Sequence, residues 1–134
     1  MNEAFVEIPL DDRRHAETDE FSFVLKPSGD RGIGVFATHG IAEGTPLRLF
    51  PDGATREFTH EQLDRDPRLG KFCEFYGVDL GTGCSVAPDF GRMSVGWYLN
   101  HSEAPNARRN DQWDYFASRD IAANEEVTID YREL

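Results

Sequence analysis

Val95-Gly96-Trp97-Tyr98-Leu99-Asn100-His101-Ser102 joins an apolar run directly to three polar residues, and Pro105-Asn106-Ala107 follows it closely. Two further segments flank this stretch along the chain: Arg31-Gly32-Ile33-Gly34-Val35-Phe36-Ala37 before it and Glu125-Glu126-Val127-Thr128-Ile129-Asp130-Tyr131 after it. Each segment alone is weak, because a polar cluster after an apolar run is often an ordinary turn whose side chains bond local backbone. Their order and spacing together decide the fold.

Short β-rich runs separated by glycine turns predict a mainly β domain. We expect strands over residues 21–25, 33–38 and 45–50, and another that starts at Tyr115. Pro46 has no N–H for a ladder bond, so the third strand should begin there or lie at an edge. Segments 35–44 and 116–125 share a strand, a polar corner, an Ile-Ala pair and a turn, which predicts two related hairpins.

Two other parts of the chain have different character. Residues 1–20 are polar with few apolar anchors and predict a flexible arm or an edge segment. Residues 51–88 contain several glycines and predict an irregular insert, in which Thr59-His60-Glu61-Gln62-Leu63 is typical of a capped helical turn. With 134 residues, the chain has room for one domain, which we place at 21–134.

The glycine segment also fits the dinucleotide-binding pattern G-x-G-x-x-A, from Gly32 to Ala37. That pattern requires a helix at the glycines, whereas β-branched and aromatic residues follow here and Gly40, Gly44 and Pro46 would break a helix. A nucleotide fold is therefore disfavoured. We interpret the segment as a bulged hairpin with positive φ at Gly32 and Gly34, whose backbone lets a flat ligand approach closely.

Taken together, the three segments resemble the SET domain, and the similarity covers about residues 21–131. The resemblance implies a mainly β, β-clip fold of short strands with a C-terminal pseudoknot. In this pseudoknot the C-terminal segment passes beneath a loop around Asn100 and His101. The insert at 51–88 interrupts the similarity.

The resemblance also implies a cofactor, S-adenosylmethionine, held by Gly32, Ile33, Gly34, Asn100 and His101, with Tyr131 as the catalytic residue. The implied activity is that of a protein-lysine N-methyltransferase. The alternative is a catalytically inactive SET-like module that binds a peptide or protein through the same groove. A hydrolase that uses Ser102 and His101 is disfavoured, because adjacent residues rarely aim at each other and no nucleophile elbow surrounds them.

The resemblance gives Tyr98 and Ile129 as candidate residues of the substrate-lysine channel. Ile129 stands where the family commonly has an aromatic residue that influences the number of methyl groups added, so that number stays open. Tyr76 and Tyr115 are further candidates, equally consistent with the core. The chain ends three residues after Tyr131, although the family usually has a following segment that completes the channel. We expect a homodimer partner or the N-terminal arm to complete it.

Charge and composition restrict the partners. A net charge of −11 disfavours nucleic acid, because binding there requires clustered Lys and Arg. A basic protein or peptide, such as a histone-like or ribosomal tail, fits an acidic surface. Without a run of eighteen apolar residues or a signal peptide, we expect no membrane association and a cytoplasmic location.

The two cysteines, Cys73 and Cys84, lie apart from the four histidines, and their spacing matches no zinc or redox motif. We interpret both as buried thiols. No cysteine cluster follows Tyr131, so we expect no metal.

Overall fold

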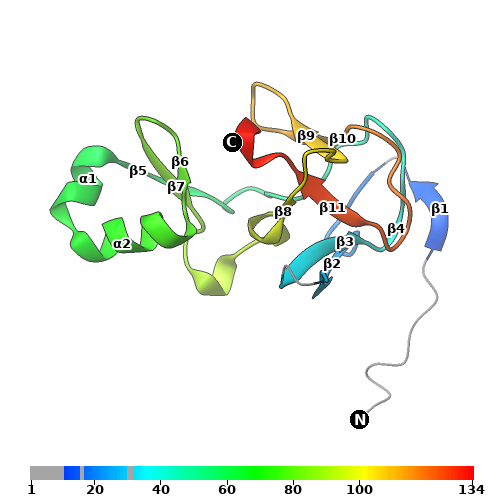
Figure 1. Cartoon of the computed structure of the whole chain (residues 1–134), viewed down its shortest axis with the longest axis horizontal. Helices are drawn as coiled ribbons and strands as arrows, with labels where there is room; N and C mark the ends of the chain where they lie inside the picture. The colour runs from blue at the N-terminus through cyan, green and yellow to red at the C-terminus, as the bar shows by residue number, and fades with distance from the viewer. Residues whose placement is uncertain (1–10, 16, 30–31) are drawn as a thin grey trace, which may run out of the picture.

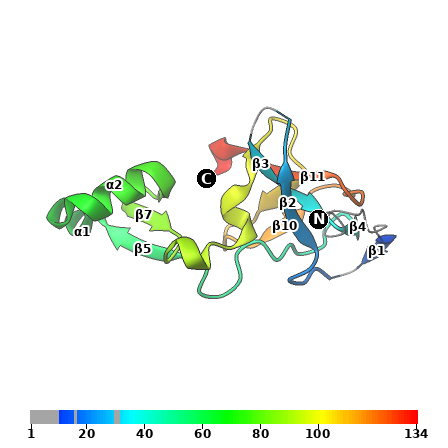
Figure 2. The ribbon, with the colours of Figure 1, turned by 90° about the horizontal axis from the view of Figure 1, so that it is seen from below.

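The computed structural model describes residues 11–15, 17–29 and 32–134, which form the predicted mainly β fold with only two α-helices. The insert lies at one end of the molecule and the other strands at the opposite end (Figures 1 and 2). The strands outside the insert are β1 (Asp11–His15), β2 (Phe23–Pro27), β3 (Ile33–Ala37), β4 (His39–Ile41), β8 (Asn100–His101), β9 (Ala107–Arg109), β10 (Tyr115–Ala117) and β11 (Glu126–Ile129). Short 3-10 helices are η2 (Phe90–Arg92), η3 (Val95–Tyr98) and η4 (Tyr131–Glu133).

The central sheet has the strand order β2-β3-β11-β8. Its interior strand β11 is antiparallel to β3 on one side and parallel to β8 on the other. The register places Val127 opposite Val35, and Ile129 opposite His101. The predicted pseudoknot requires a C-terminal segment held between earlier parts of the chain, and β11 occupies that position (Figure 1).

Asn106, in the loop between β8 and β9, holds β11 in place through its side chain. It is 1% exposed. Its Oδ1 accepts a hydrogen bond from the Thr128 N–H at 2.9 Å, and its Nδ2 donates to the Glu126 carbonyl at 2.8 Å. One side chain thus satisfies two backbone groups of β11 that have little access to water.

The two related hairpins predicted from segments 35–44 and 116–125 pair with each other. Ile41 and Ile121 exchange reciprocal backbone hydrogen bonds of 2.8 Å, and they are 0% and 1% exposed. The pairing is antiparallel. The similarity between the segments therefore corresponds to an approximate two-fold relation centred on these isoleucines.

The turns of the two segments are equivalent as well. The Gly44 N–H donates to the Ala117 carbonyl at 2.7 Å, and the Asn124 N–H donates to the Ala37 carbonyl at 2.7 Å. Gly44 and Asn124 both have positive φ, 86° and 68°, a region that glycine and asparagine tolerate. Each turn thus caps the strand of the other segment.

The main core lies between these hairpins and the central sheet. Its members are buried, mainly apolar side chains, namely Phe23, Val35, Ala37, Ile41, Leu47, Leu49, Leu99, Ala107, Tyr115, Ala117, Ile121, Val127 and Ile129. Leu99, which precedes β8, and Ile129, which ends β11, both belong to this core. The core therefore holds these two strand ends in place.

The insert is more regular than predicted. It forms a sheet of order β5-β7-β6 beside two helices: β5 (Arg56–Thr59), α1 (His60–Arg65), α2 (Pro67–Tyr76), β6 (Val78–Asp79) and β7 (Gly83–Val86). The predicted helical part of the insert is present, and several of its glycines lie at element boundaries, such as Gly77 after α2 and Gly81 between β6 and β7. The capped turn is confirmed, since Thr59 and Gln62 form reciprocal capping bonds at the start of α1.

A second, small core fills the insert and contains both cysteines. Cys73 and Cys84 are free and buried, as predicted. Burial, and then the neighbouring Cys73, raises the pKa of the Cys84 thiol to about 12. Cys84 is therefore an uncharged packing residue at neutral pH.

One strand prediction requires correction. Residues 45–50 form no strand, and Pro46 makes an isolated bridge with Phe116. The bridge does not extend, because the Thr45 N–H donates to the Ala42 carbonyl and the Leu49 N–H to the Leu47 carbonyl. Within the predicted arm, β1 pairs in parallel with β4, and Thr18 accepts a hydrogen bond from the Arg48 N–H at 2.8 Å. Residues 11–15 thus form an edge segment, whereas residues 1–10 and 16 lie outside the described part of the chain.

Candidate active site

The predicted cofactor residues meet because β11 lies between β3 and β8. Gly32 and Gly34 lie at the start of β3, Asn100 and His101 form β8, and Tyr131 follows β11 after one residue. More than sixty residues separate the first two segments and about thirty separate the last two, and the sheet order brings them to one region. Strand pairing thus brings the predicted cofactor residues together.

The glycine segment differs in part from the prediction. Gly32 has a φ of +77°, and no atom lies within 4 Å of the position a Cβ would occupy. Gly34 does not have positive φ, and β2 and β3 pair in continuous register, so the bulge predicted there is wrong. Gly34 is required for another reason: a Cβ there would overlap the Glu126 carboxylate and come within 2.9 Å of Asn100 Nδ2.

Glu126 is a site residue to which sequence reasoning gave no role. Its Oε2 accepts a hydrogen bond from Asn100 Nδ2 at 2.8 Å, and its Oε1 accepts one from the Ser28 hydroxyl at 2.6 Å. Asn100 Nδ2 also donates to the Ile33 carbonyl at 3.2 Å. The only sequence signal was the motif Glu125-Glu126 itself, which does not reveal which of the two carboxylates points toward Gly34.

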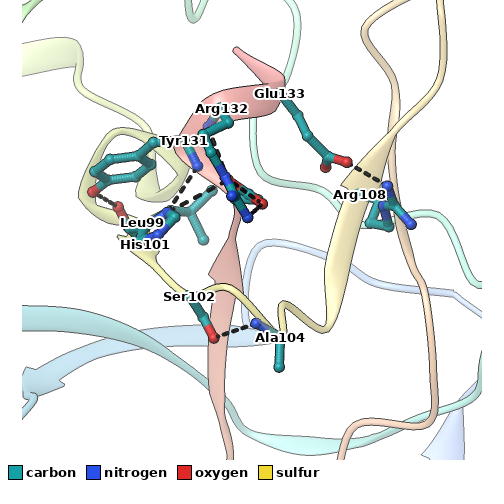
Figure 3. Close-up of polar contacts among 9 residues, drawn as sticks. Leu99, His101, Ser102, Ala104, Arg108, Tyr131, Arg132 and Glu133 are labelled. Atoms are coloured by element: carbon teal, nitrogen blue, oxygen red, sulfur yellow. Dashed lines mark hydrogen bonds and ion pairs between the residues drawn. The ribbon is translucent and has the colours of Figure 1, made fainter.

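His101 anchors the backbone of the catalytic candidate. The Tyr131 N–H donates to His101 Nδ1 at 3.0 Å, so Nδ1 carries no proton in this arrangement. The two rings lie 5.3 Å apart (Figure 3). His101 therefore sets where the chain turns after β11.

Tyr131 presents its hydroxyl to a main-chain acceptor. The hydroxyl donates to the Leu99 carbonyl at 2.6 Å, and the residue is 48% exposed (Figure 3). Because its proton is directed at Leu99, the Tyr131 oxygen can act as a hydrogen-bond acceptor toward a bound group. Ser102, whose Oγ accepts from the Ala104 N–H at 3.0 Å, belongs to a local turn in the same view.

Tyr131 lies at the wall of a cavity of about 850 Å³. The cavity extends from the insert to the main core. Seven aromatic side chains line it, namely Phe50, Phe75, Tyr76, Trp97, Trp113, Tyr115 and Tyr131. Two exposed carboxylates, Asp52 and Glu57, also line it, and none of its lining residues is basic.

The residues predicted for the lysine channel differ in whether they line this cavity. Ile129, Tyr76 and Tyr115 line it, whereas Tyr98 does not and instead packs against the main core. Trp97, which sequence reasoning did not select, lines the cavity and donates its indole N–H to the Ala54 carbonyl at 3.0 Å. The apolar run before Asn100 thus contributes Trp97 to the cavity and Tyr98 to packing.

Asp130 is the most strongly perturbed carboxylate of the site region. It is 8% exposed. Hydrogen bonds from the Arg132 side chain and then from the Arg132 N–H lower its pKa from 3.8 to about 2. Burial opposes this shift and is outweighed.

We expect this carboxylate to make the protein sensitive to acid. Its pKa is lower in the folded than in the unfolded chain, so its contribution is complete above pH 4 and is lost as the pH falls toward 2. In urea titrations between pH 5 and pH 2, the unfolding free energy of wild type should fall more steeply with pH than that of Asp130→Asn. The difference between the two slopes should correspond to at most about one proton taken up on unfolding. Parallel profiles for the two proteins would contradict this assignment.

Within the described residues no helix is long and apolar enough to span a membrane. The same residues contain no group of three or more His, Cys, Asp or Glu side chains arranged to hold a metal ion.

Comparisons with known proteins agree with this geometry. A sequence profile of the SET domain matches residues 32–132. Among solved structures, the chain is similar to a candidate histone methyltransferase from Plasmodium falciparum, with a TM-score of 0.53 and 19% identity over 82% of this chain and 92% of the other. A search of curated proteins finds no match. The profile covers most of the chain, from the glycine segment to the residue after Tyr131, and the chain belongs to the SET domain family.

Proposed function

We propose that this protein is a protein-lysine N-methyltransferase that uses S-adenosylmethionine. The observation that carries the proposal is the position of Tyr131: its hydroxyl bonds the Leu99 carbonyl at the wall of an aromatic, partly acidic cavity, and its backbone is tied to His101. Membership of the SET family supports the reaction class, as does the name of the Plasmodium falciparum relative.

The residues present fit the proposed cofactor. Space is open beside Gly32, Ile33 is 52% exposed, and the crowding at Gly34 comes from side chains rather than from a neighbouring strand. We propose that the backbone of Gly32, Ile33 and Gly34, together with Asn100 and His101, holds the cofactor. When bound there, it would supply an electrophilic methyl group on a sulfonium.

The chain's own residues would prepare the lysine amine. Free lysine has a pKa near 10.4, so removing its proton at pH 7 costs about 4.6 kcal/mol. Aromatic walls can remove water from around the ammonium, and this loss of solvation lowers the lysine pKa. The Tyr131 oxygen, whose proton is directed at Leu99, can accept an amine N–H and so orient the nitrogen lone pair.

A basic protein or peptide, such as a histone-like or ribosomal tail, is the proposed substrate. The net charge of −11 and the exposed Asp52 and Glu57 at the cavity would attract a cationic segment. A cytoplasmic location, a lack of direct nucleic-acid binding and a homodimer that completes the lysine channel remain parts of this proposal.

Calorimetry and a transfer assay test the proposal together. S-adenosylhomocysteine should bind in a one-to-one ratio, and tritiated methyl groups should pass from S-adenosylmethionine to lysines of basic proteins. Cofactor binding and peptide binding without transfer would favour the inactive SET-like module. Failure to bind the cofactor would overturn the proposed reaction.

A further inference from the structure

We infer that Glu126 is a positioning residue that fixes which face of the Asn100 amide meets the cofactor. This inference rests on the proposed function, because it concerns the same cofactor site. The Glu126 carboxylate is half-buried, and it lies between Ser28, the backbone at Gly34 and Asn100.

The hydrogen bonds of Asn100 determine how its side chain is oriented. Both acceptors within reach, the Glu126 carboxylate and the Ile33 carbonyl, lie on one side and use the two N–H bonds of Nδ2. A flipped amide would place Oδ1 against two acceptors, which costs two hydrogen bonds and adds repulsion. Both N–H bonds of the Asn100 amide therefore donate to protein acceptors and are not offered to a ligand.

The opposite face of Asn100 presents its oxygen. Among the described residues no donor bonds Oδ1. A ligand group at this position must therefore be a donor, as an ammonium or an exocyclic amine is, and a carboxylate is disfavoured. By fixing the orientation of the Asn100 amide, Glu126 directs the amide oxygen toward the cofactor. Glu126 itself does not contact the cofactor.

Packing prevents Glu126 from moving aside. The Ser28 hydroxyl holds Oε1 at 2.6 Å, and Ser28 is 5% exposed. The carboxylate occupies the space that a side chain at residue 34 would need. Asn106 fixes the Glu126 carbonyl at 2.8 Å, so the backbone that carries this carboxylate is fixed as well.

Two substitutions of Glu126 distinguish its role in orienting the Asn100 amide from the effect of its negative charge. Glu126→Leu removes both acceptors, so binding of S-adenosylhomocysteine should weaken about 10- to 100-fold. Glu126→Gln keeps one acceptor for Asn100, while its amide can donate to the Ser28 hydroxyl, so affinity should stay within about threefold. Equal losses in the two variants would overturn the orientation role.

A paired exchange tests the same contact from the other side. Asn100→Asp would oppose two carboxylates and should weaken binding at least about tenfold. In the Asn100→Asp, Glu126→Gln double variant the glutamine amide can donate to the aspartate, whose other oxygen still faces the cofactor, so part of the loss should be recovered. Additive losses would contradict the inference.

Matched controls and a second readout keep the test independent of catalysis. Glu125→Gln alters the adjacent carboxylate, which bonds the Ala122 N–H and Arg119, and it should leave cofactor affinity unchanged. In the protein without cofactor, NMR should show the Asn100 side-chain amide protons protected from exchange in wild type and in Glu126→Gln, but not in Glu126→Leu. Unprotected protons in folded wild type would overturn the inference. Protected protons in a protein that binds no cofactor would overturn the proposed function alone.

Discussion

Replacing Tyr131 by phenylalanine is expected to reduce methyl transfer by about two to three orders of magnitude, the scale typical of removing one polar group aimed at a reacting centre. The substitution removes only the hydroxyl, which donates to the Leu99 carbonyl at 2.6 Å. The amine would then lose the oxygen that orients it, whereas the Tyr131 N–H would still donate to His101. Single-turnover transfer of tritiated methyl groups measures the loss.

Cofactor binding supplies the control for this variant. S-adenosylhomocysteine should bind Tyr131→Phe within about twofold of wild type, because the proposed cofactor residues keep their contacts. Tyr98→Phe is the matched comparison: it loses the same hydroxyl from a tyrosine that does not line the cavity. Unchanged transfer by Tyr131→Phe, or an equal loss in Tyr98→Phe, would contradict the assignment.

Asn106→Ala is expected to cause the largest loss of stability, about 2 to 6 kcal/mol, because two interior backbone groups would lose their partners at about 1 to 3 kcal/mol each. These groups are the Thr128 N–H and the Glu126 carbonyl of β11. Since small domains are stable by only about 5 to 15 kcal/mol, this loss would approach unfolding. Urea denaturation followed by circular dichroism measures it.

Asn110→Ala is the matched control for Asn106. Asn110 Oδ1 also accepts two backbone hydrogen bonds, from Gln112 and Asp114, but the residue is exposed and water can replace its side chain. We expect a loss of about 1 kcal/mol or less. Similar losses in the two variants would show that burial of Asn106 does not determine its contribution.

Local patterns predicted those parts of the fold that depend on neighbouring residues. The hairpin of β2 and β3, the cap at Thr59 and the similarity of the two segments joined at Ile41 and Ile121 were all readable from the sequence. The strand expected at residues 45–50 is reduced to the single bridge at Pro46, because the N–H groups of Thr45 and Leu49 donate to nearby carbonyls instead of to a neighbouring strand. Strand propensity alone does not show which partner a backbone N–H will take.

Motifs predicted candidate site residues but not their contacts. They gave Tyr131, Asn100 and His101 but could not give the side of a strand on which a particular side chain lies. Glu126 and Trp97 were not selected for this reason, and Tyr98, a predicted channel residue, packs against the main core. Gly34 was assigned to backbone conformation, whereas it is needed for side chains that approach from β8 and β11.

The interior position of β11 also has a consequence during protein synthesis. The ribosome makes residues 126–129 late, yet these residues complete the sheet between β3 and β8. Until they emerge, the nascent chain carries two strands whose edges lack a partner, and such edges favour aggregation. We therefore expect folding to occur only after translation of this segment, as one cooperative and comparatively slow event dominated by contacts between distant parts of the chain.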